Sequence, residues 1–357
     1  MRIVVIGASG NVGTAVLRWL AEQNPVGPVV GVCRRPPPRC PPYDVARWAG
    51  VDVSRPDADA ELAALLRPDD VVVNLAWGFQ PTRDVAYLER VGVGGLRSLL
   101  TAARRTGVGQ IVHLSSVGAY RAAPGRLVDE TWPTDGVAGS AYSRHKAMAE
   151  QLLDDFQAQL GADGPVVTRF RPGLILQRAA GSELLRYTLP GYLPARLLRH
   201  LPVLPLDRRL AVSVVHSDDV ARAVVTAADR RADGAFNLAA EPPLTRDDIA
   251  DVLGARAVHV PSRVIRAAAA LTWHARLQRV SPGWLDLAFA APLLDTGRAR
   301  RELDWRPARD ARSALREVID GMTEAASGDS PALRRRTVAG QGVELLRHGP
   351  VTRRPVA

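Results

Sequence analysis

The sequence predicts an α/β protein in which a doubly wound parallel sheet carries a smaller C-terminal lobe. Two observations support this prediction. Short β-branched runs alternate with helical patterns over the first half of the chain, which is typical of a parallel sheet with helices on both faces. The first run also ends in a glycine-rich turn, GASGNVG, that leads directly into a helical pattern.

The predicted strands occur in a regular order. They are RIVVIG (2–7), GPVVGVCR (27–34), DDVVVNLAW (69–77) and GQIVHLSS (109–116), and PVVTRFRPG (165–173) continues the series. Helical patterns lie between them, among them VGTAVLRWLAEQ (12–23), VGGLRSLLTAARRTG (93–107) and KAMAEQLLDDFQAQLG (146–161). Because strands and helices alternate along the chain, we expect the strands to be parallel and joined by helical crossovers.

Changes in this rhythm mark the predicted domains. Residues 1–173 form the sheet domain, and residues 174–325, which begin with Pro-rich and Leu-rich sequence, form mainly a second lobe. The segment VSVVHSDDVARAVVTAADR predicts a strand and a helix capped by Ser217 or Asp218, so residues 211–230 are expected to return to the first domain. Residues 326–357 lack a sustained period and are predicted to be a loosely attached, Arg-rich tail.

Composition excludes several classes of protein. The chain of 357 residues is 46% hydrophobic and 24% charged, as in an ordinary globular protein, and lacks the apolar window of about 18 residues that a membrane span needs. The net charge of +10 does not indicate nucleic-acid binding, because most arginines are interleaved with acids and others gather in the tail. Histidines show no metal-ligand spacing, so no metal is expected. We predict a cytoplasmic protein that acts on a small molecule; its oligomeric state is left open, with a homodimer among the options.

The glycine turn predicts a dinucleotide site in a Rossmann-type domain. Glycines after a first strand allow a tight turn and let the backbone approach a pyrophosphate, while the helix N-terminus supplies N–H donors. A structural turn is the alternative, but the position between a strand and a helix favours the nucleotide. The turn residues expected to bind the cofactor are Gly7, Ser9, Gly10, Asn11, Val12 and Gly13.

The residues after the second strand predict which dinucleotide is bound. An acid there would bind the ribose 2′-OH of NAD, whereas a basic residue accommodates the 2′-phosphate of NADP. Here Cys33 precedes Arg34 and Arg35, which favours NADP over NAD, unless both arginines merely extend into water. The segment GVDVS (50–54) is expected to end a further strand, the third in chain order, and places Asp52 and Val53 near the adenine. Leu75 and Ala76 end the fourth strand beside the dinucleotide.

Tyr142 and Lys146 form the most informative pair of side chains. Lys146 is the only lysine among 47 Lys and Arg residues, and the spacing of four places both residues on one face of a helix. A free Tyr has a pKa of about 10, which is too high for a general acid or base at neutral pH, and a nearby ammonium lowers that pKa. Lys is suited to this task because it is a compact charge that can also bond ribose hydroxyls. An exposed helical pair is the alternative.

Together these pieces resemble the extended branch of the short-chain dehydrogenase/reductase superfamily, the NAD-dependent epimerase/dehydratase group. The resemblance runs in order through GASGNVG (7–13), NLAW (74–77), HLSSVGAY (113–120), YSRHK (142–146), FRPG (170–173), VHSDDVARAV (215–224), GAFNLAAEPPLTRDDIADVLG (234–254) and DTGRARRELDWRP (295–307). It implies that Tyr142 is the catalytic acid/base and that Lys146 holds the nicotinamide ribose. It also implies that Ser116 binds the substrate oxygen. Ser115 is the residue to test if Ser116 proves to have no such role, and it is placed among the residues that contact the cofactor. Pro172 would bring the backbone to the nicotinamide amide.

Two departures from the family pattern are visible. Gly92 stands where related chains often have an Asn, so a proton relay through that side chain is not expected. The segment after Pro172 reads GLILQR where a further Gly is common, so the wall around the nicotinamide is expected to differ. Trp273, Trp284 and Trp305 are interpreted as packing residues of the second lobe, with stacking on a substrate as the alternative.

Three functions agree with these observations. The preferred one is an NAD(P)-dependent oxidoreductase that transfers hydride at a carbonyl or alcohol carbon. The second is a nucleotide-sugar epimerase or dehydratase that recycles bound NAD. The third is a non-catalytic NADP-sensing regulator, which Ser116, Tyr142 and Lys146 argue against. Nothing in the second lobe specifies the substrate.

Overall fold

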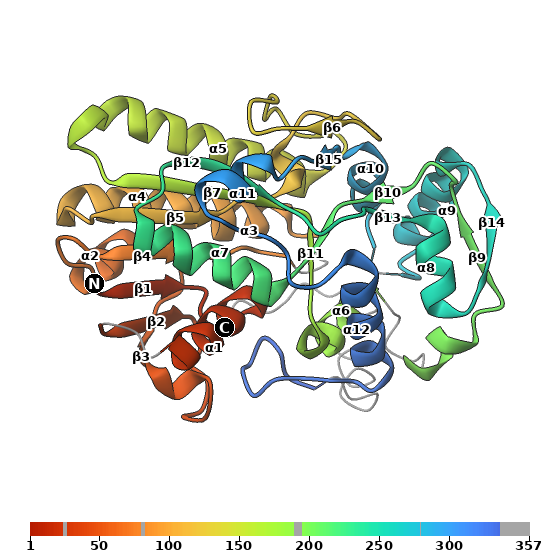
Figure 1. Cartoon of the computed structure of the whole chain (residues 1–357), viewed down its shortest axis with the longest axis horizontal. Coiled ribbons are helices and arrows are strands. Elements are labelled where there is room, and N and C mark those ends of the chain that lie inside the picture. Colours follow the sequence, from red (N-terminus) through yellow and green to blue (C-terminus); the bar gives the residue numbers. More distant parts are fainter. Residues whose placement is uncertain (24–26, 80–82, 189–194, 279, 336–357) are drawn as a thin grey trace.

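A seven-stranded parallel sheet forms the centre of the first domain (Figure 1). The computed structural model describes residues 1–23, 27–79, 83–188, 195–278 and 280–335. The strand order is β12-β7-β5-β4-β1-β2-β3, so the chain reverses direction across the sheet between β1 and β4. Five strands match the predicted runs: β1 (Ile3–Ile6), β2 (Val29–Cys33), β4 (Val71–Asn74), β5 (Gln110–Leu114) and β7 (Val166–Pro172). The predicted doubly wound α/β fold is confirmed.

Two further strands complete the sheet at its edges. β3 (Ala46–Gly50) pairs with β2 in parallel. β12 (Gly234–Leu238) comes from the second half of the chain and pairs in parallel with β7. The edge strand β12 therefore joins the sheet domain only after the chain has passed through part of the second lobe.

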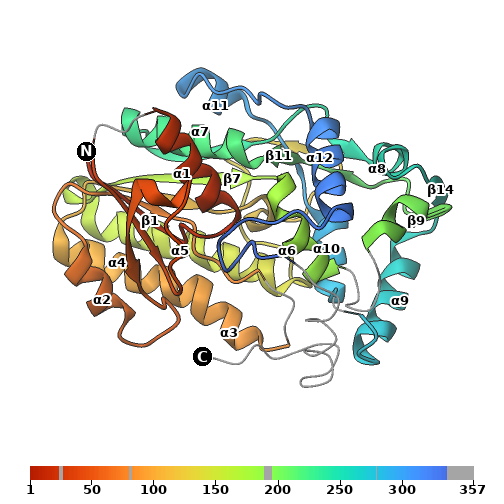
Figure 2. The same ribbon diagram turned by 90° about the horizontal axis from the view of Figure 1, so that it is seen from below.

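Helices cover both faces of the sheet, as Figure 2 shows. One face carries α1 (Asn11–Gln23) and α7 (Ser217–Arg230), and the other carries α2 (Ala58–Leu65), α4 (Gly95–Thr106) and α5 (Ala141–Leu160). Each face buries a continuous apolar cluster between helices and strands. Burying a Val or Leu side chain fully stabilises the folded state by about 1.5–3 kcal/mol relative to leaving it exposed. These two clusters therefore stabilise the sheet that carries the loops at the strand ends.

The second lobe lies beyond the carboxyl ends of the strands, on the right in Figure 1. Its elements include α6 (Gly181–Thr188), α8 (Arg246–Leu253), α9 (Ser262–His274), α10 (Pro282–Ala290) and α12 (Ala311–Thr323). Short two-stranded pairs connect its parts: β8 (Leu174–Leu176) with β11 (Val214–His216), β9 (Val203–Leu206) with β14 (Arg256–His259), β10 (Ala211–Val212) with β13 (Leu244–Thr245), and β6 (Leu127–Val128) with β15 (Leu293–Leu294). No helix within the described ranges is long and apolar enough to cross a membrane.

The part of the chain that returns to the first domain is longer than residues 211–230. Helix α7 packs against α1, and β12 then enters the central sheet. Trp305, which follows α11 (Gly297–Glu302), is buried in the same apolar cluster as α1 and donates from its indole N–H to the carbonyl of Asp219 at 2.8 Å. The interpretation of Trp305 as a packing residue of the second lobe is therefore wrong, because this tryptophan anchors the chain to the core of the first domain before α12 begins.

The cap of α7 differs from the prediction. The N-cap is His216, whose side chain accepts a hydrogen bond from the backbone N–H of Asp218, and neither Ser217 nor Asp218 is the capping residue. Because the strand β11 ends directly at His216, the helix begins one residue earlier than Ser and Asp propensities indicate.

The prediction of a loosely attached tail is wrong for its first ten residues, 326–335. Ser330 and Leu333 are both 0% exposed, and the Ser330 hydroxyl donates to the carbonyl of Ser9 at 2.7 Å. This segment thus packs on the glycine turn. The buried Ser330 hydroxyl and the buried Leu333 side chain hold it there, although its sequence has no helical or strand periodicity. Residues 336–357 of the predicted tail lie outside the described residues.

Candidate active site

The glycine turn between β1 and α1 has the shape that a dinucleotide needs. Gly7 has a φ of +83°, and a Cβ on it would lie 2.7 Å from the backbone N of Ala76. A Cβ on Gly13 would lie 2.4 Å from the carbonyl oxygen of Gly7, so helix and strand approach too closely for any side chain. At Gly10 an added Cβ would meet only the Gly7 carbonyl, at 3.3 Å, and would otherwise fill open space. The turn therefore leaves a cradle at the helix N-terminus into which a pyrophosphate fits.

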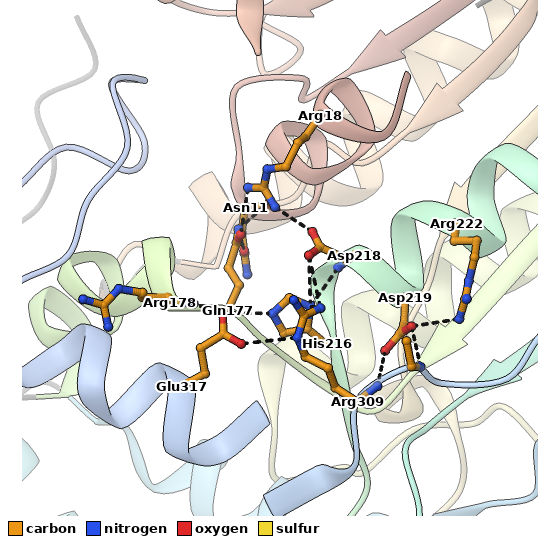
Figure 3. A network of polar contacts seen from close by, with 11 residues as sticks. Asn11, Arg18, Gln177, Arg178, His216, Asp218, Asp219, Arg222, Arg309 and Glu317 are labelled. Atoms are coloured by element: carbon orange, nitrogen blue, oxygen red, sulfur yellow. Dashed lines mark hydrogen bonds and ion pairs between the residues drawn. The ribbon is translucent and has the colours of Figure 1, made fainter. Parts of the chain in front are cut away.

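A polar network connects this turn to the second lobe (Figure 3). Gln177 donates from its side-chain amide to the carbonyl of Asn11 at 2.9 Å and to the side-chain oxygen of the same residue. Arg18, about two turns further along α1 than Asn11, donates to Asp218 at 2.6 Å. The GLILQR segment thus supplies, through Gln177, a side chain that orients Asn11 at the start of α1.

His216 extends the same network to α12. Its Nδ1 accepts from the backbone N–H of Asp218 at 3.2 Å and from Arg309 at 3.0 Å. Since both contacts require a lone pair on Nδ1, the ring proton lies on Nε2 and points to the carboxylate of Glu317 at 3.3 Å. The network spans the helices α1, α7 and α12 and holds the second lobe against the glycine turn.

The end of β2 presents the predicted basic residues. Arg34 is half-buried and donates to the Tyr87 hydroxyl at 3.1 Å, with the Asp52 carboxylate 3.9 Å away. Arg35 is exposed. Cys33 is buried, and burial raises the pKa of its thiol in spite of hydrogen bonds from Ser9 and from the backbone of Arg35. Positions 33–35 thus hold no acidic residue, and the guanidinium of Arg34 is held in place by Tyr87 and by the Asp52 carboxylate beside it.

The other predicted cofactor residues lie at neighbouring strand ends. Asp52 follows β3 and accepts hydrogen bonds from the backbone and hydroxyl of Ser54 at 3.0 and 2.7 Å. Val53 packs where α4 begins, since a Cβ on Gly95 would lie 3.0 Å from its methyl group. Leu75 and Ala76 follow β4 beside Gly7, and Val12 is buried in the first turn of α1. Leu75, Ala76 and Val12 thus lie at the reversal of strand order between β1 and β4, where ligands bind in folds of this kind, whereas Asp52 and Val53 follow the edge strand of the same half of the sheet.

Ser116 and Tyr142 meet at the end of β5. The Ser116 hydroxyl accepts from the backbone N–H of Gly118 at 3.0 Å, which caps a short helical turn, and it is hydrogen-bonded to Tyr142. A Cβ on Gly118 would lie 3.0 Å from the tyrosine ring, so a side chain at this position would crowd the ring. Tyr142 lies in the first turn of α5, whose N-cap Ser140 accepts from the backbone of Ser143.

Lys146 lies one turn further along α5. Its ammonium donates to the carbonyl of Leu114 at 2.7 Å and lies 3.5 Å from the centroid of the Trp77 ring. The distance from the ammonium to the centroid of the Tyr142 ring is 6.0 Å. Burial lowers the pKa of Lys146 to about 7, although the charge of Glu150 acts in the opposite direction.

The predicted lowering of the Tyr142 pKa is wrong for this structure. Loss of hydration raises the pKa of Tyr142 to about 12, and the hydrogen bond with Ser116 opposes this only in part. The ammonium of Lys146 does not reverse the shift, because burial disfavours the charged form of both side chains. At neutral pH the phenol therefore carries its proton and is ready to donate it.

Aromatic side chains enclose Tyr142. Trp284 of α10 lies with its ring centroid 4.9 Å from that of Tyr142, and Phe79 lies 5.6 Å away from the same ring. Phe79 and Trp284 contact one another at 4.8 Å between centroids. Each of these rings is half-buried, so part of its surface stays accessible. We call Phe79, Trp284 and the Tyr142 ring the aromatic wall.

A buried ionic network lies behind the catalytic candidates. Ser115 donates to Glu150 at 2.6 Å, so its hydroxyl is turned away from Ser116 and toward this carboxylate. Glu150 also accepts from Arg171 at 2.9 and 3.0 Å and from Arg169 at 3.1 Å. Pro172 ends β7 next to Arg171 and is buried. Among the residues that the structure describes, no group of three or more His, Cys, Asp or Glu side chains is arranged to hold a metal ion.

The comparison with protein families decides the family. Residues 3–239, which include the glycine turn, Ser116, Tyr142 and Lys146, match the model of the NAD dependent epimerase/dehydratase family. The chain belongs to this family. It is therefore an enzyme of the epimerase/dehydratase family, whose curated relatives include dehydrogenases and dehydratases.

Curated relatives of the epimerase/dehydratase chain include two kinds of enzyme. A 3 beta-hydroxysteroid dehydrogenase/Delta 5-->4-isomerase of Mycobacterium tuberculosis is 26% identical over 352 residues, and the alignment covers 89% of each chain. A dTDP-glucose 4,6-dehydratase of Streptomyces antibioticus is 30% identical over 180 residues, covering 46% of this chain and 51% of the relative. The first relative matches along nearly the whole chain.

Solved structures of the epimerase/dehydratase fold superpose on most of the molecule. A UDP-glucose 4-epimerase of Thermus thermophilus in complex with NAD has a TM-score of 0.66 at 20% identity, covering 91% of this chain and 100% of that one. A dTDP-glucose 4,6-dehydratase of Streptomyces venezuelae with bound NAD has a TM-score of 0.68 at 21% identity, covering 91% and 97%. These likenesses confirm the fold.

Several residues of this epimerase/dehydratase site were missed by sequence reasoning. Glu150 follows Lys146 by four residues, as Lys146 follows Tyr142, so helical periodicity could have placed it on the same face. Trp77 ends the quoted motif NLAW, yet its contact with Lys146 has no signal in the sequence. Trp284 was interpreted as a packing residue, and it lies instead against Tyr142.

Proposed function

We propose that this enzyme catalyses the net NADP-linked reduction or oxidation of a carbonyl or secondary alcohol on an apolar, ring-containing small molecule. The observation that carries this proposal is the aromatic wall. A site that places Phe79 and Trp284 around the phenol favours a flat, apolar substrate, because aromatic faces gain most from burying such surface. The similarity along 89% of the chain to a hydroxysteroid dehydrogenase supports the same substrate class.

The charges near the wall give a second reason. A nucleotide sugar carries a diphosphate, which proteins commonly bind with unengaged arginines. Arg266 of α9, the helix that packs on α10, forms two hydrogen bonds with Asp286, at 2.5 and 3.1 Å. Arg83 lies 5.0 Å from the ring centroid of Trp273 and donates to its carbonyl. These two guanidinium groups already have partners, which favours an uncharged substrate.

The chemistry follows from the positions of three side chains. A bound nicotinamide supplies or accepts the hydride at the substrate carbon. In the reducing direction Ser116 orients the carbonyl oxygen, and Tyr142, which is protonated at neutral pH, donates its proton to that oxygen. Lys146 binds the ribose hydroxyls with the N–H groups that do not bond Leu114. The homodimer and the cytoplasmic location stay predictions.

Cofactor preference provides one test. We expect NADPH to bind at least about tenfold more tightly than NADH, and Arg34→Ala to abolish this difference, because charge-assisted hydrogen bonds contribute about 1.5–3 kcal/mol. Fluorescence titration of the purified enzyme with each dinucleotide measures it. Arg39→Ala, an exposed arginine of the same segment, is the matched control and should keep the preference. Equal affinities in the wild type would refute the basic pocket.

Substrate class provides the other test. Assayed with NADPH, the enzyme should reduce apolar cyclic ketones, and Trp284→Ala should lower kcat/KM for them about tenfold, since a stacked aromatic pair contributes about 0.5–1.5 kcal/mol beyond its buried area. Trp284→Phe keeps a ring and should retain most activity. Stoichiometric NAD released on unfolding the purified protein, together with turnover of a UDP-sugar or dTDP-sugar, would overturn the proposal in favour of a recycling epimerase or dehydratase.

A further inference from the structure

Lys146 is a buried cation with few polar partners. Its side chain is 2% exposed, and its ammonium donates to the Leu114 carbonyl at 2.7 Å. Among the described residues no carboxylate forms an ion pair with it, because Glu150 is already engaged by Ser115 and two arginines. Burying an ammonium is costly unless another group compensates for lost hydration. The Trp77 ring, whose centroid lies 3.5 Å from the ammonium, is that group.

The indole of Trp77 is held from several sides. It meets the ring of His113 edge-on at 6.3 Å and that of Tyr142 edge-on at 6.3 Å. Trp77 follows β4, where the chain leaves the sheet beside the cofactor turn. The ring is therefore placed by β4 and clamped between β5 and α5, with its face toward the lysine.

Gly92 makes the space for this ring. A Cβ at position 92 would lie 3.0 Å from each of three indole carbons. Gly92 lies in a π-helical turn, Arg90–Gly94, just before α4, and such turns widen a helix locally and frequently occur at functional sites. The indole of Trp77 therefore lies so close to Gly92 that a side chain at position 92 would crowd it.

We propose that Trp77 is a positioning residue that holds the Lys146 ammonium at the cofactor ribose, and that Gly92 is the small residue that admits it. This inference rests on the proposed role of Lys146 and goes beyond it, because it assigns the support of the lysine to an aromatic face. Lys146 also faces Tyr142 and Glu150 on its own helix and His113 on β5. None of these three supplies the contact that the indole makes.

The single lysine of the chain allows a direct test. When the enzyme is produced with isotope-labelled lysine, Lys146 gives the only labelled side-chain signal, and its chemical shift and titration can be followed by NMR. In the wild type we expect a strong ring-current shift and a titration midpoint near pH 7. Trp77→Leu keeps the site apolar but removes the π face, so the midpoint should fall by about one pH unit and the ring-current shift should vanish. Trp77→Phe should restore both.

Position 92 provides the reciprocal test. Gly92→Asn should displace the indole and reproduce the NMR signature of Trp77→Leu, with a lower thermal midpoint. Combining it with Trp77→Ala relieves the clash, so the thermal midpoint should recover while the lysine signature stays lost. Gly92→Ala is the milder variant if the Asn protein does not fold, and it should shift the same signal in the same direction.

Steady-state kinetics separate this inference from the proposed function. Trp77→Leu should raise KM for the dinucleotide about tenfold and lower kcat, and Trp77→Phe should restore both. An enzyme inactive on every substrate tested would count against the proposed function, whereas the NMR signal would still report the Trp77–Lys146 contact. A lysine signal that Trp77→Leu leaves unchanged in shift and midpoint would overturn the inference, whatever the activity.

Discussion

Replacing Tyr142 with Phe is expected to lower kcat by about 10²- to 10⁴-fold, the contribution typical of a positioned acid or base. The ring and its contacts with Phe79 and Trp284 are kept, and only the hydroxyl that bonds Ser116 is lost. Dinucleotide affinity should therefore stay close to that of the wild type. Single-turnover kinetics together with a binding titration distinguish a lost proton donor from a damaged site.

The raised pKa of Tyr142 also predicts how the rates of reduction and oxidation change with pH. Because the pKa of Tyr142 is raised to about 12, the phenol stays protonated over the neutral range, so carbonyl reduction should be nearly independent of its ionisation there. Alcohol oxidation needs the deprotonated form and should accelerate as pH rises through the alkaline range. Tyr43→Phe removes a buried hydroxyl that contacts Thr14, away from Ser116, and is the control. Retention of more than about a tenth of the wild-type rate by Tyr142→Phe would show that another group moves the proton.

Local signals explain why much of the fold could be predicted. The glycine turn depends on residues within one strand–turn–helix unit, and the Tyr142 and Lys146 pair depends on one helix, so their spacing is visible in the sequence. The strand ends Asp52 and Ala76 followed from counting strands. Both residues follow the carboxyl ends of strands in one parallel sheet, Ala76 after β4 at the reversal of strand order and Asp52 after the edge strand β3.

Long-range burial explains what could not be predicted. The shift in the Tyr142 pKa was predicted with the wrong sign because burial outweighs the other influences on the phenol. The rings that pack on Tyr142, Phe79 and Trp284, come from segments that are far away in sequence. The cap of α7 depends on where β11 ends, and the attachment of the tail depends on Ser330 reaching Ser9. The contacts of Tyr142 and Ser330 join segments that no periodicity relates, whereas the cap of α7 is a local contact between His216 and the backbone N–H of Asp218.

Glu150 carries the largest expected effect on stability. Its carboxylate is 1% exposed and accepts hydrogen bonds from Ser115, Arg169 and Arg171. Glu150→Ala would leave two buried guanidinium groups without their shared partner, which typically costs about 3–5 kcal/mol of the free energy of unfolding. Urea denaturation should therefore show a clearly lower midpoint, and Glu150→Gln should lie between this variant and the wild type because it keeps the shape and one acceptor.

Asp154 offers a matched control on the same arginine. It pairs with Arg169 at 2.6 Å, but its side chain is 55% exposed, so Asp154→Ala should cost no more than about 1 kcal/mol. Burial would raise the pKa of Glu150, but the hydrogen bonds and charge of Arg171 outweigh it and lower the pKa to about 2. A carboxylate with a lowered pKa stabilises the fold above its unfolded pKa, so this contribution should persist at neutral pH and fade between about pH 4.5 and pH 2. Glu150→Gln should lose that acid-dependent part of the stability curve while Asp154→Ala keeps it. Equal losses in the two alanine variants would mean that burial does not set the strength of this network.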